Sequence, residues 1–198
     1  MKRVLCFGDS NTHGTMPMRS LMDRGRYDEA TRWPMAMAAA LGPTWRVIED
    51  GLPGRTTVHP DPIEGAHKNG RAMLPASLET HRPLDHVIVM LGTNDLKTRF
   101  SVTPFDIAKS LEGLAATIGT SQCGPEGTAP AVLLVAPVPI VETGLLVGMF
   151  EGGAAKSRAL ATEVAAAAEG VHLDVDSHAR LGTALAQHLG GEGNAQGT

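Results

Sequence analysis

The chain lacks the features of membrane, metal-binding and nucleic-acid-binding proteins. No apolar run approaches the roughly 20 residues that span a bilayer, and the four apolar residues that follow Met1-Lys2-Arg3 are too few for a signal-peptide core. Only 2 cysteines are present, which excludes a disulfide framework, and no Cys/His set has zinc-site spacing. Aromatic residues make up 4% of the chain, too few for base-stacking surfaces. We therefore expect a cytoplasmic protein without membrane or nucleic-acid partners.

Charge and length set further limits. The net charge is −4, with Lys and Arg scattered along the chain, so no basic surface for a polyanion is expected. A length of 198 residues suits a single domain. We assign that domain to residues 1–189 and expect residues 190–198 to form a flexible tail. Cys6 falls in an apolar run and is expected in the core, whereas the Gly/Pro-rich loop around Cys123 allows that thiol to be exposed.

Strands and helices alternate in the predicted pattern. Apolar runs predict strands at residues 4–7, 45–49, 84–91 and 131–136. Helical composition and start signals predict helices at residues 35–41, 69–80, 103–119, 154–168 and 177–189. This alternation is typical of an α/β fold, a three-layer α/β/α sandwich around a central parallel sheet.

Ser10 lies where the first predicted strand ends. The sequence Gly8-Asp9-Ser10-Asn11 cannot continue a strand, so the chain must turn there. Ligands of open parallel sheets bind just beyond the carboxyl ends of the strands. Ser10 is therefore a candidate nucleophile. The alternative is that Ser10 only caps the following helix.

Two further polar turns follow predicted strands at the same edge of the sheet. One contains Gly54 and the other contains Asn94. Acyl transfer needs hydrogen-bond donors for a developing oxyanion, and the Ser10 N–H, the Gly54 N–H and the Asn94 side-chain amide are suitable donors. A serine also needs a base. Of the eight histidines, His172 is preferred because it lies in a Gly-containing loop with an acidic residue on each side, Glu169 and Asp174.

These motifs together resemble those of a known family. The matching stretches are Gly8-Asp9-Ser10-Asn11, Gly54, Gly92-Thr93-Asn94-Asp95 and Glu169-Gly170-Val171-His172. In this order they resemble the four motif blocks of the SGNH (GDSL-type) hydrolases, and most closely the bacterial arylesterase and acyltransferase branch.

The resemblance implies a flavodoxin-like sandwich with Ser10 as nucleophile and His172 as base. It also implies an oxyanion hole of Ser10, Gly54 and Asn94, and no metal or organic cofactor. Members of this branch cleave small esters, often acetyl esters, of alcohols and phenols, and some transfer the acyl group to an alcohol. They are commonly homo-oligomers.

The region before His172 departs from the family pattern. Relatives have Asp where this chain has Glu169. The helix predicted at residues 154–168 runs almost directly into Glu169, which leaves no room for the fifth strand that relatives usually have. Three possibilities stay open: Glu169 is the acid of the triad, Asp174 or Asp176 replaces it, or the site has no acid.

Several other residues near the motifs have expected roles. Asn11 and His13 are candidates for the substrate pocket. Asp9 and Asp95 are expected to hold their turns, and Arg55 to orient the Gly54 loop through a carboxylate.

The leading function is a serine esterase acting on small acyl esters. The alternatives are a deacetylase for carbohydrates or small metabolites, and a non-catalytic flavodoxin-like module that binds phosphate.

Overall fold

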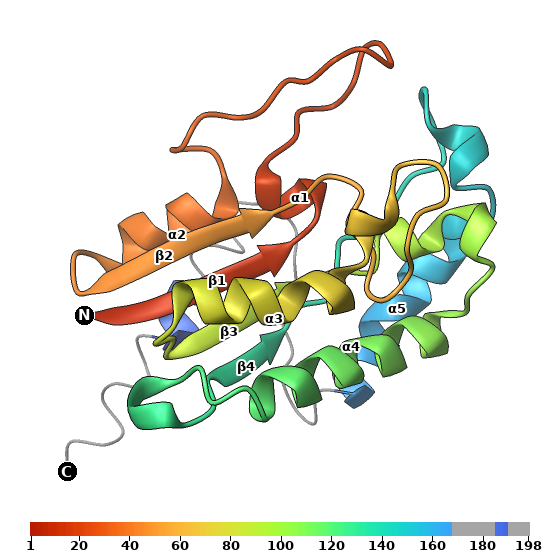
Figure 1. The fold of residues 1–198 in the computed structure, drawn as a ribbon. Helices are drawn as coiled ribbons and strands as arrows, with labels where there is room; N and C mark the ends of the chain where they lie inside the picture. Colours follow the sequence, from red (N-terminus) through yellow and green to blue (C-terminus); the bar gives the residue numbers. More distant parts are fainter. Residues whose placement is uncertain (168–184, 190–198) are drawn as a thin grey trace.

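A computed structural model describes residues 1–167 and 185–189 of the chain (Figure 1). In that part, four parallel strands form one sheet in the order β2-β1-β3-β4. The strands are β1 (Lys2–Gly8), β2 (Trp45–Gly51), β3 (His86–Met90) and β4 (Ala131–Leu134). The predicted α/β class and parallel sheet are confirmed.

Helices connect the strands and cover both faces of the sheet. They are α1 (Ser10–His13), α2 (Trp33–Leu41), α3 (Gly70–His81), α4 (Pro104–Gly119) and α5 (Gly153–Ala167). The α4 helix begins with the capping box that its sequence predicts, because Thr103 and Asp106 each bond the backbone N–H of the other.

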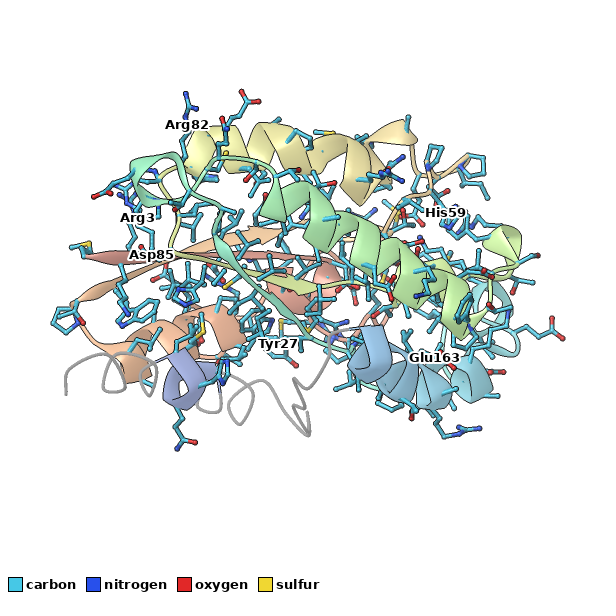
Figure 2. The ribbon with its side chains drawn as sticks, turned by 90° about the horizontal axis from the view of Figure 1, so that it is seen from below. Arg3, Tyr27, His59, Arg82, Asp85 and Glu163 are labelled. Carbon is cyan, nitrogen blue, oxygen red and sulfur yellow. The ribbon has the colours of Figure 1, made fainter. Side chains whose placement is uncertain are left out.

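The two faces of the sheet belong to separate apolar clusters. Leu5 and Phe7 of β1 pack with side chains of α3, α4 and α5, whereas Val4 and Cys6 pack with α2 and residues 185–189. This alternation follows from the two-residue period of a strand, whose successive side chains point to opposite faces. Figure 2 shows the sheet between α3 and α4 on one side and α2 on the other. The two central strands, β1 and β3, are thus near-continuous apolar runs buried on both faces, whereas β2 at the edge of the sheet is only partly buried.

The strand order favours a ligand site at the carboxyl edge of the sheet. From β1 the chain passes to β2 on one side and then crosses to β3 on the other side. Connections therefore diverge between β1 and β3, and ligands of open α/β sheets bind at such a divergence. The opposite, amino edge holds Asp85, which accepts a 2.7 Å hydrogen bond from the Arg3 backbone N–H. Figure 2 shows Arg3 and Asp85 together at one end of the molecule and His59 at the other.

The surroundings of Cys123 differ from those expected. Cys123 is buried, with 2% of its surface exposed, so the idea that its loop exposes the thiol is wrong. Its N–H and thiol both bond Ser121, and its side chain joins the larger apolar cluster. The prediction that the chain lacks a fifth strand concerns residues outside the described ones. The same holds for most of the helix expected at 177–189 and for the tail expected at 190–198. Among the described helices, none is long and apolar enough to cross a bilayer.

Candidate active site

Ser10 is the first residue of α1 and is separated from the end of β1 by Asp9 alone. The cap of this helix is Asp9, whose Oδ1 accepts a 2.8 Å hydrogen bond from the Asn11 N–H. The capping role therefore belongs to the neighbouring carboxylate, and the interpretation of Ser10 as only a cap is not needed to explain the helix. Ser10 is half-buried at the carboxyl edge.

A glycine allows α1 to pack closely on the end of β1. A Cβ atom on Gly8 would collide with the Thr12 hydroxyl. Any larger residue at position 8 would push the helix away from the strand. The Gly8 side of the motif thus fixes the position of Ser10 relative to the sheet.

Asp9 is completely buried behind Ser10. Burial raises the pKa of its carboxyl group from 3.8 to about 6, although hydrogen bonds from Asn11 and Thr93 act in the opposite direction. Asp9 thus holds its turn as the sequence indicates, but ionisation of its buried carboxyl group is costly.

Gly54 follows β2 in a turn that requires glycine. Its φ is +82°, and a Cβ at this position would collide with the Glu64 carboxylate. The next residue, Arg55, is buried and donates to the Gly8 carbonyl at 2.9 Å and to the Asp50 carboxylate at 2.8 Å. Arg55 therefore orients the Gly54 loop through a carboxylate, as expected, and also ties this loop to the end of β1.

Asn94 lies after β3 and contacts both other turns. Its Nδ2 atom donates to the Arg55 carbonyl at 3.1 Å and lies 3.4 Å from Asp9 Oδ2. The residue is only 6% exposed. The structure thus brings the turns of Ser10, Gly54 and Asn94 together at the carboxyl edge of the sheet.

Asp95 joins its own turn to the Gly54 loop. Besides a bond from its own backbone N–H, its carboxylate accepts from the backbone N–H of Thr57 at 3.1 and 3.0 Å and from the Thr57 hydroxyl. Burial raises the pKa of this carboxyl group, against the hydrogen bonds from Thr57 and the nearby His59. The bond joins residues 38 positions apart and ties the Asn94 turn to the Gly54 loop.

The two candidate pocket residues have different surroundings. Asn11 lies next to the Asn94 turn, with its Nδ2 3.4 Å from the Thr93 hydroxyl. His13 is 3.0 Å from the Thr15 hydroxyl, and its pKa is lowered by burial and by Arg26 and Arg32. Asn11 therefore borders the converging turns, whereas His13 contacts the start of the loop at residues 15–32.

A cluster of four charged residues was missed by the sequence interpretation. Lys97 Nζ lies 3.2 Å from Asp61 Oδ2 and also bonds Glu64, while Arg99 lies 3.1 Å from Asp61 Oδ1. The Asp61 side chain is fully buried, but hydrogen bonds from Glu64, Ile63 and Lys97 outweigh burial and lower its pKa. The partners are more than 30 positions apart, so no local pattern marks them.

The proposed base and its acid cannot be placed. His172, Glu169, Asp174 and Asp176 all lie outside the described residues. Their roles stay predictions.

Comparisons with known proteins agree on one family. The model of the GDSL-like Lipase/Acylhydrolase family matches residues 6–195. A carbohydrate acetylesterase from Sinorhizobium meliloti is 39% identical, with a TM-score of 0.88 over 97% of this chain and 100% of that chain. The inhibitor-bound aryl esterase of M. smegmatis is 37% identical, with a TM-score of 0.86 over 96% and 99% of the two chains. A putative arylesterase from Agrobacterium tumefaciens is 34% identical, with a TM-score of 0.80 over 96% and 99%. A search of curated protein sequences gives no match.

Proposed function

Because the chain belongs to the GDSL-like lipase/acylhydrolase family, we propose that it cleaves small acyl esters, chiefly acetyl esters, through an acyl-enzyme on Ser10. The chain is a carboxylester hydrolase. The observation that carries the assignment to Ser10 is the convergence of three turns, which Asn94 joins by contacts to Arg55 and Asp9.

The proposed reaction begins with attack of the Ser10 hydroxyl on the ester carbonyl. His172 takes the hydroxyl proton and later gives it to the departing alcohol, while Glu169 orients the imidazole. The negative charge on the carbonyl oxygen is stabilised by the N–H groups of Ser10 and Gly54 and by the Asn94 amide. Water then attacks the acyl-enzyme and releases the carboxylic acid. The interlocked turns support this scheme, because they hold Ser10, Gly54 and Asn94 at one edge of the sheet. To serve as a donor, the Asn94 amide exchanges its 3.4 Å contact with Asp9 for the oxyanion and keeps its bond to the Arg55 carbonyl.

The alcohol portion of the substrate has two candidates. Esters of simple alcohols and phenols are supported by the likeness to the aryl esterase of M. smegmatis. Acetylated carbohydrates are supported by the likeness to the Sinorhizobium meliloti acetylesterase. A panel of p-nitrophenyl acetate, phenyl acetate and acetylated monosaccharides, ranked by kcat/KM, separates them. Added alcohol would reveal acyl transfer, through the ratio of new ester to free acid.

The nucleophile is tested by Ser10→Ala. We expect kcat for p-nitrophenyl acetate to fall by about 10³-fold or more, and labelling by a fluorophosphonate probe to be lost. Ser110→Ala is the matched control, because the Ser110 hydroxyl bonds the Asp106 carbonyl within α4. Wild-type rates in Ser10→Ala, or probe attachment at another residue, would contradict the proposal. The phosphate-binding alternative requires a wild-type protein that the probe does not label.

The setting of the enzyme is also a proposal. We propose a cytoplasmic enzyme that takes small-molecule esters, has neither nucleic-acid nor membrane partners and self-associates. The net charge of −4, with dispersed Lys and Arg, supports the first part. Exposed apolar side chains support the last part, and they are Leu21, Met22, Val141 and Leu145.

A further inference from the structure

Lys68 contacts the peptide unit that carries one of the proposed oxyanion donors. Its ammonium group donates a 2.7 Å hydrogen bond to the Pro53 carbonyl oxygen. This oxygen and the Gly54 N–H are the two ends of one planar peptide unit. Resting on the function proposed above, we infer that Lys68 is a positioning residue that orients and polarises the Gly54 N–H for the oxyanion.

The main chain of Lys68 is fixed beside the Gly54 loop. The Lys68 carbonyl accepts from the Thr56 N–H at 2.9 Å and from the Thr56 hydroxyl at 3.2 Å. Two residues further, the Gly70 N–H donates to the Thr56 carbonyl at 3.1 Å. The start of α3 is thus paired with the segment that follows Gly54. From there the Lys68 side chain extends past Gly54 to the Pro53 carbonyl.

The side chain also packs on Gly54 itself. The Cε and Cδ atoms of Lys68 lie 3.2 and 3.4 Å from where a Gly54 Cβ would be. The same space is bordered by Glu64. Lys68 therefore confines the peptide unit by contact as well as by its hydrogen bond.

The nearby carboxylates are already balanced by other cations. Glu64 is paired with Lys97 and lies 3.6 Å from Arg99, and the same two cations hold Asp61. Two cations thus face two carboxylates in the cluster, and the bond of Lys68 to Pro53 adds a further positive charge next to the Gly54 peptide.

The expected effect follows from the chemistry of the amide. A cation bonded to a carbonyl oxygen withdraws electron density through the conjugated peptide unit, so its N–H becomes a stronger donor. The gain is largest when the N–H faces a full negative charge, as in the tetrahedral intermediate. The Lys68 charge is thus directed at the transition state and contributes little to binding of the neutral ester.

Replacing Lys68 by Met removes the charge and keeps the length of the side chain. We expect Lys68→Met to lower kcat/KM for p-nitrophenyl acetate by about 10-fold, less than loss of a whole oxyanion donor, with KM changed by less than about 2-fold. The inhibition constant of phenylboronic acid, which forms a negatively charged tetrahedral adduct on serine, should rise by a similar factor. Lys156→Met is the matched control, because Lys156 also donates to a backbone carbonyl, that of Val102 at 2.9 Å.

Restoring the charge chemically separates its effect from packing. In Lys68→Cys, alkylation by 2-bromoethylamine displaces bromide, forms a C–S bond and rebuilds an ammonium group at nearly the length of lysine. Alkylation by iodoacetamide adds a neutral group of similar size. The native Cys6 and Cys123 are buried, so position 68 is the accessible thiol among the described residues. We expect the aminoethylated protein to recover most of the lost kcat/KM and the carboxamidomethylated protein to recover none.

The outcomes distinguish this inference from the proposed function. A wild-type enzyme that the fluorophosphonate probe does not label at Ser10 would overturn the proposed function, and the role of Lys68 with it. A labelled wild type with unchanged kcat/KM in Lys68→Met would overturn only the Lys68 inference. Equal losses in Lys68→Met and Lys156→Met, or equal recovery with both alkylating reagents, would also overturn it.

Discussion

At the scale of single residues, the buried carboxyl group of Asp9 gives the folded protein a distinctive dependence on pH. Its pKa is 3.8 in the unfolded chain and about 6 in the fold, mainly because of burial. Between these values the folded state binds more protons than the unfolded state, so its stability falls as the pH rises. The shift corresponds to about 3 kcal/mol of unfolding free energy, all of it lost above pH 6.

Asp9→Asn isolates this contribution, because the amide cannot ionise. Other carboxyl groups titrate in both proteins, so the informative quantity is the difference in unfolding free energy between variant and wild type. We expect this difference to shift in favour of the variant by about 2 kcal/mol between pH 4 and pH 7, measured by urea denaturation. A constant difference across this range would show that Asp9 does not titrate as the structure indicates.

The residues that sequence reasoning selects share one property, which is their place directly after an apolar run. Ser10, Gly54 and Asn94 each follow a predicted strand, and parallel strands end at one edge. Lys68 carries no such signal, since its importance depends on a bond to a carbonyl 15 positions earlier. The sequence predicts Asp95 as a local turn residue, because short polar side chains often bond their own turn, but it gives no sign of the second, distant partner Thr57.

At the scale of elements, the charged cluster holds the long loop between β2 and α3 against the turns after β3. Asp61 and Glu64 belong to the loop, and Lys97 and Arg99 belong to the turns. Lys97 is 3% exposed and Asp61 is fully buried. Removing Lys97 is costly, because the buried Asp61 and the half-buried Glu64 then keep only Arg99 of the two cations in the cluster.

Lys97→Met is therefore expected to destabilise the protein by about 3 kcal/mol. Lys109→Met is the control, because Lys109 is paired with Glu112 on the surface of α4, with its side chain 53% exposed. For such a surface pair, a change below about 0.5 kcal/mol is expected. Urea denaturation of both variants tests the contrast, and similar losses in the two would argue against a structural role for the cluster.

Helices and strands were predictable where apolar residues occur along the chain in a pattern that fits one or two buried faces. The apolar runs located the described strands, and start signals located α2, α3 and α4 to within a few residues. The loop at residues 15–32 follows from its lack of period. Its attachment does not, because it depends on Arg32, which bonds the Glu49 carboxylate of β2 through two nitrogens at 2.8 Å.

At the scale of the whole molecule, two segments extend from the carboxyl edge of the sheet (Figure 1), and both carry exposed large apolar side chains. Leu21 and Met22 are 61% and 79% exposed on the segment after β1, and Val141 and Leu145 are 75% and 50% exposed on the segment after β4. Exposed large apolar side chains that gather on one surface are often covered by another protein chain.

If a second copy of the chain covers these segments, the protein should sediment as a species larger than one chain. Leu21→Glu combined with Val141→Glu would place charges in the contact and should yield monomers, while the same change at exposed Ile63, in a different loop, should have less effect. Sedimentation velocity distinguishes these results. A monomeric wild type would remove the proposal of self-association.

The parallel sheet also has a practical polarity. All three proposed donor turns lie at the carboxyl edge, whereas the turns that enter β2 and β4 lie at the amino edge. Pro43 and Thr44 are exposed in the first of these turns, and residues 125–129 are exposed in the second. A surface attachment or an affinity handle at either turn would hold the molecule by the end remote from Ser10. The enzyme could then be fixed to a support with its reactive edge facing the solution.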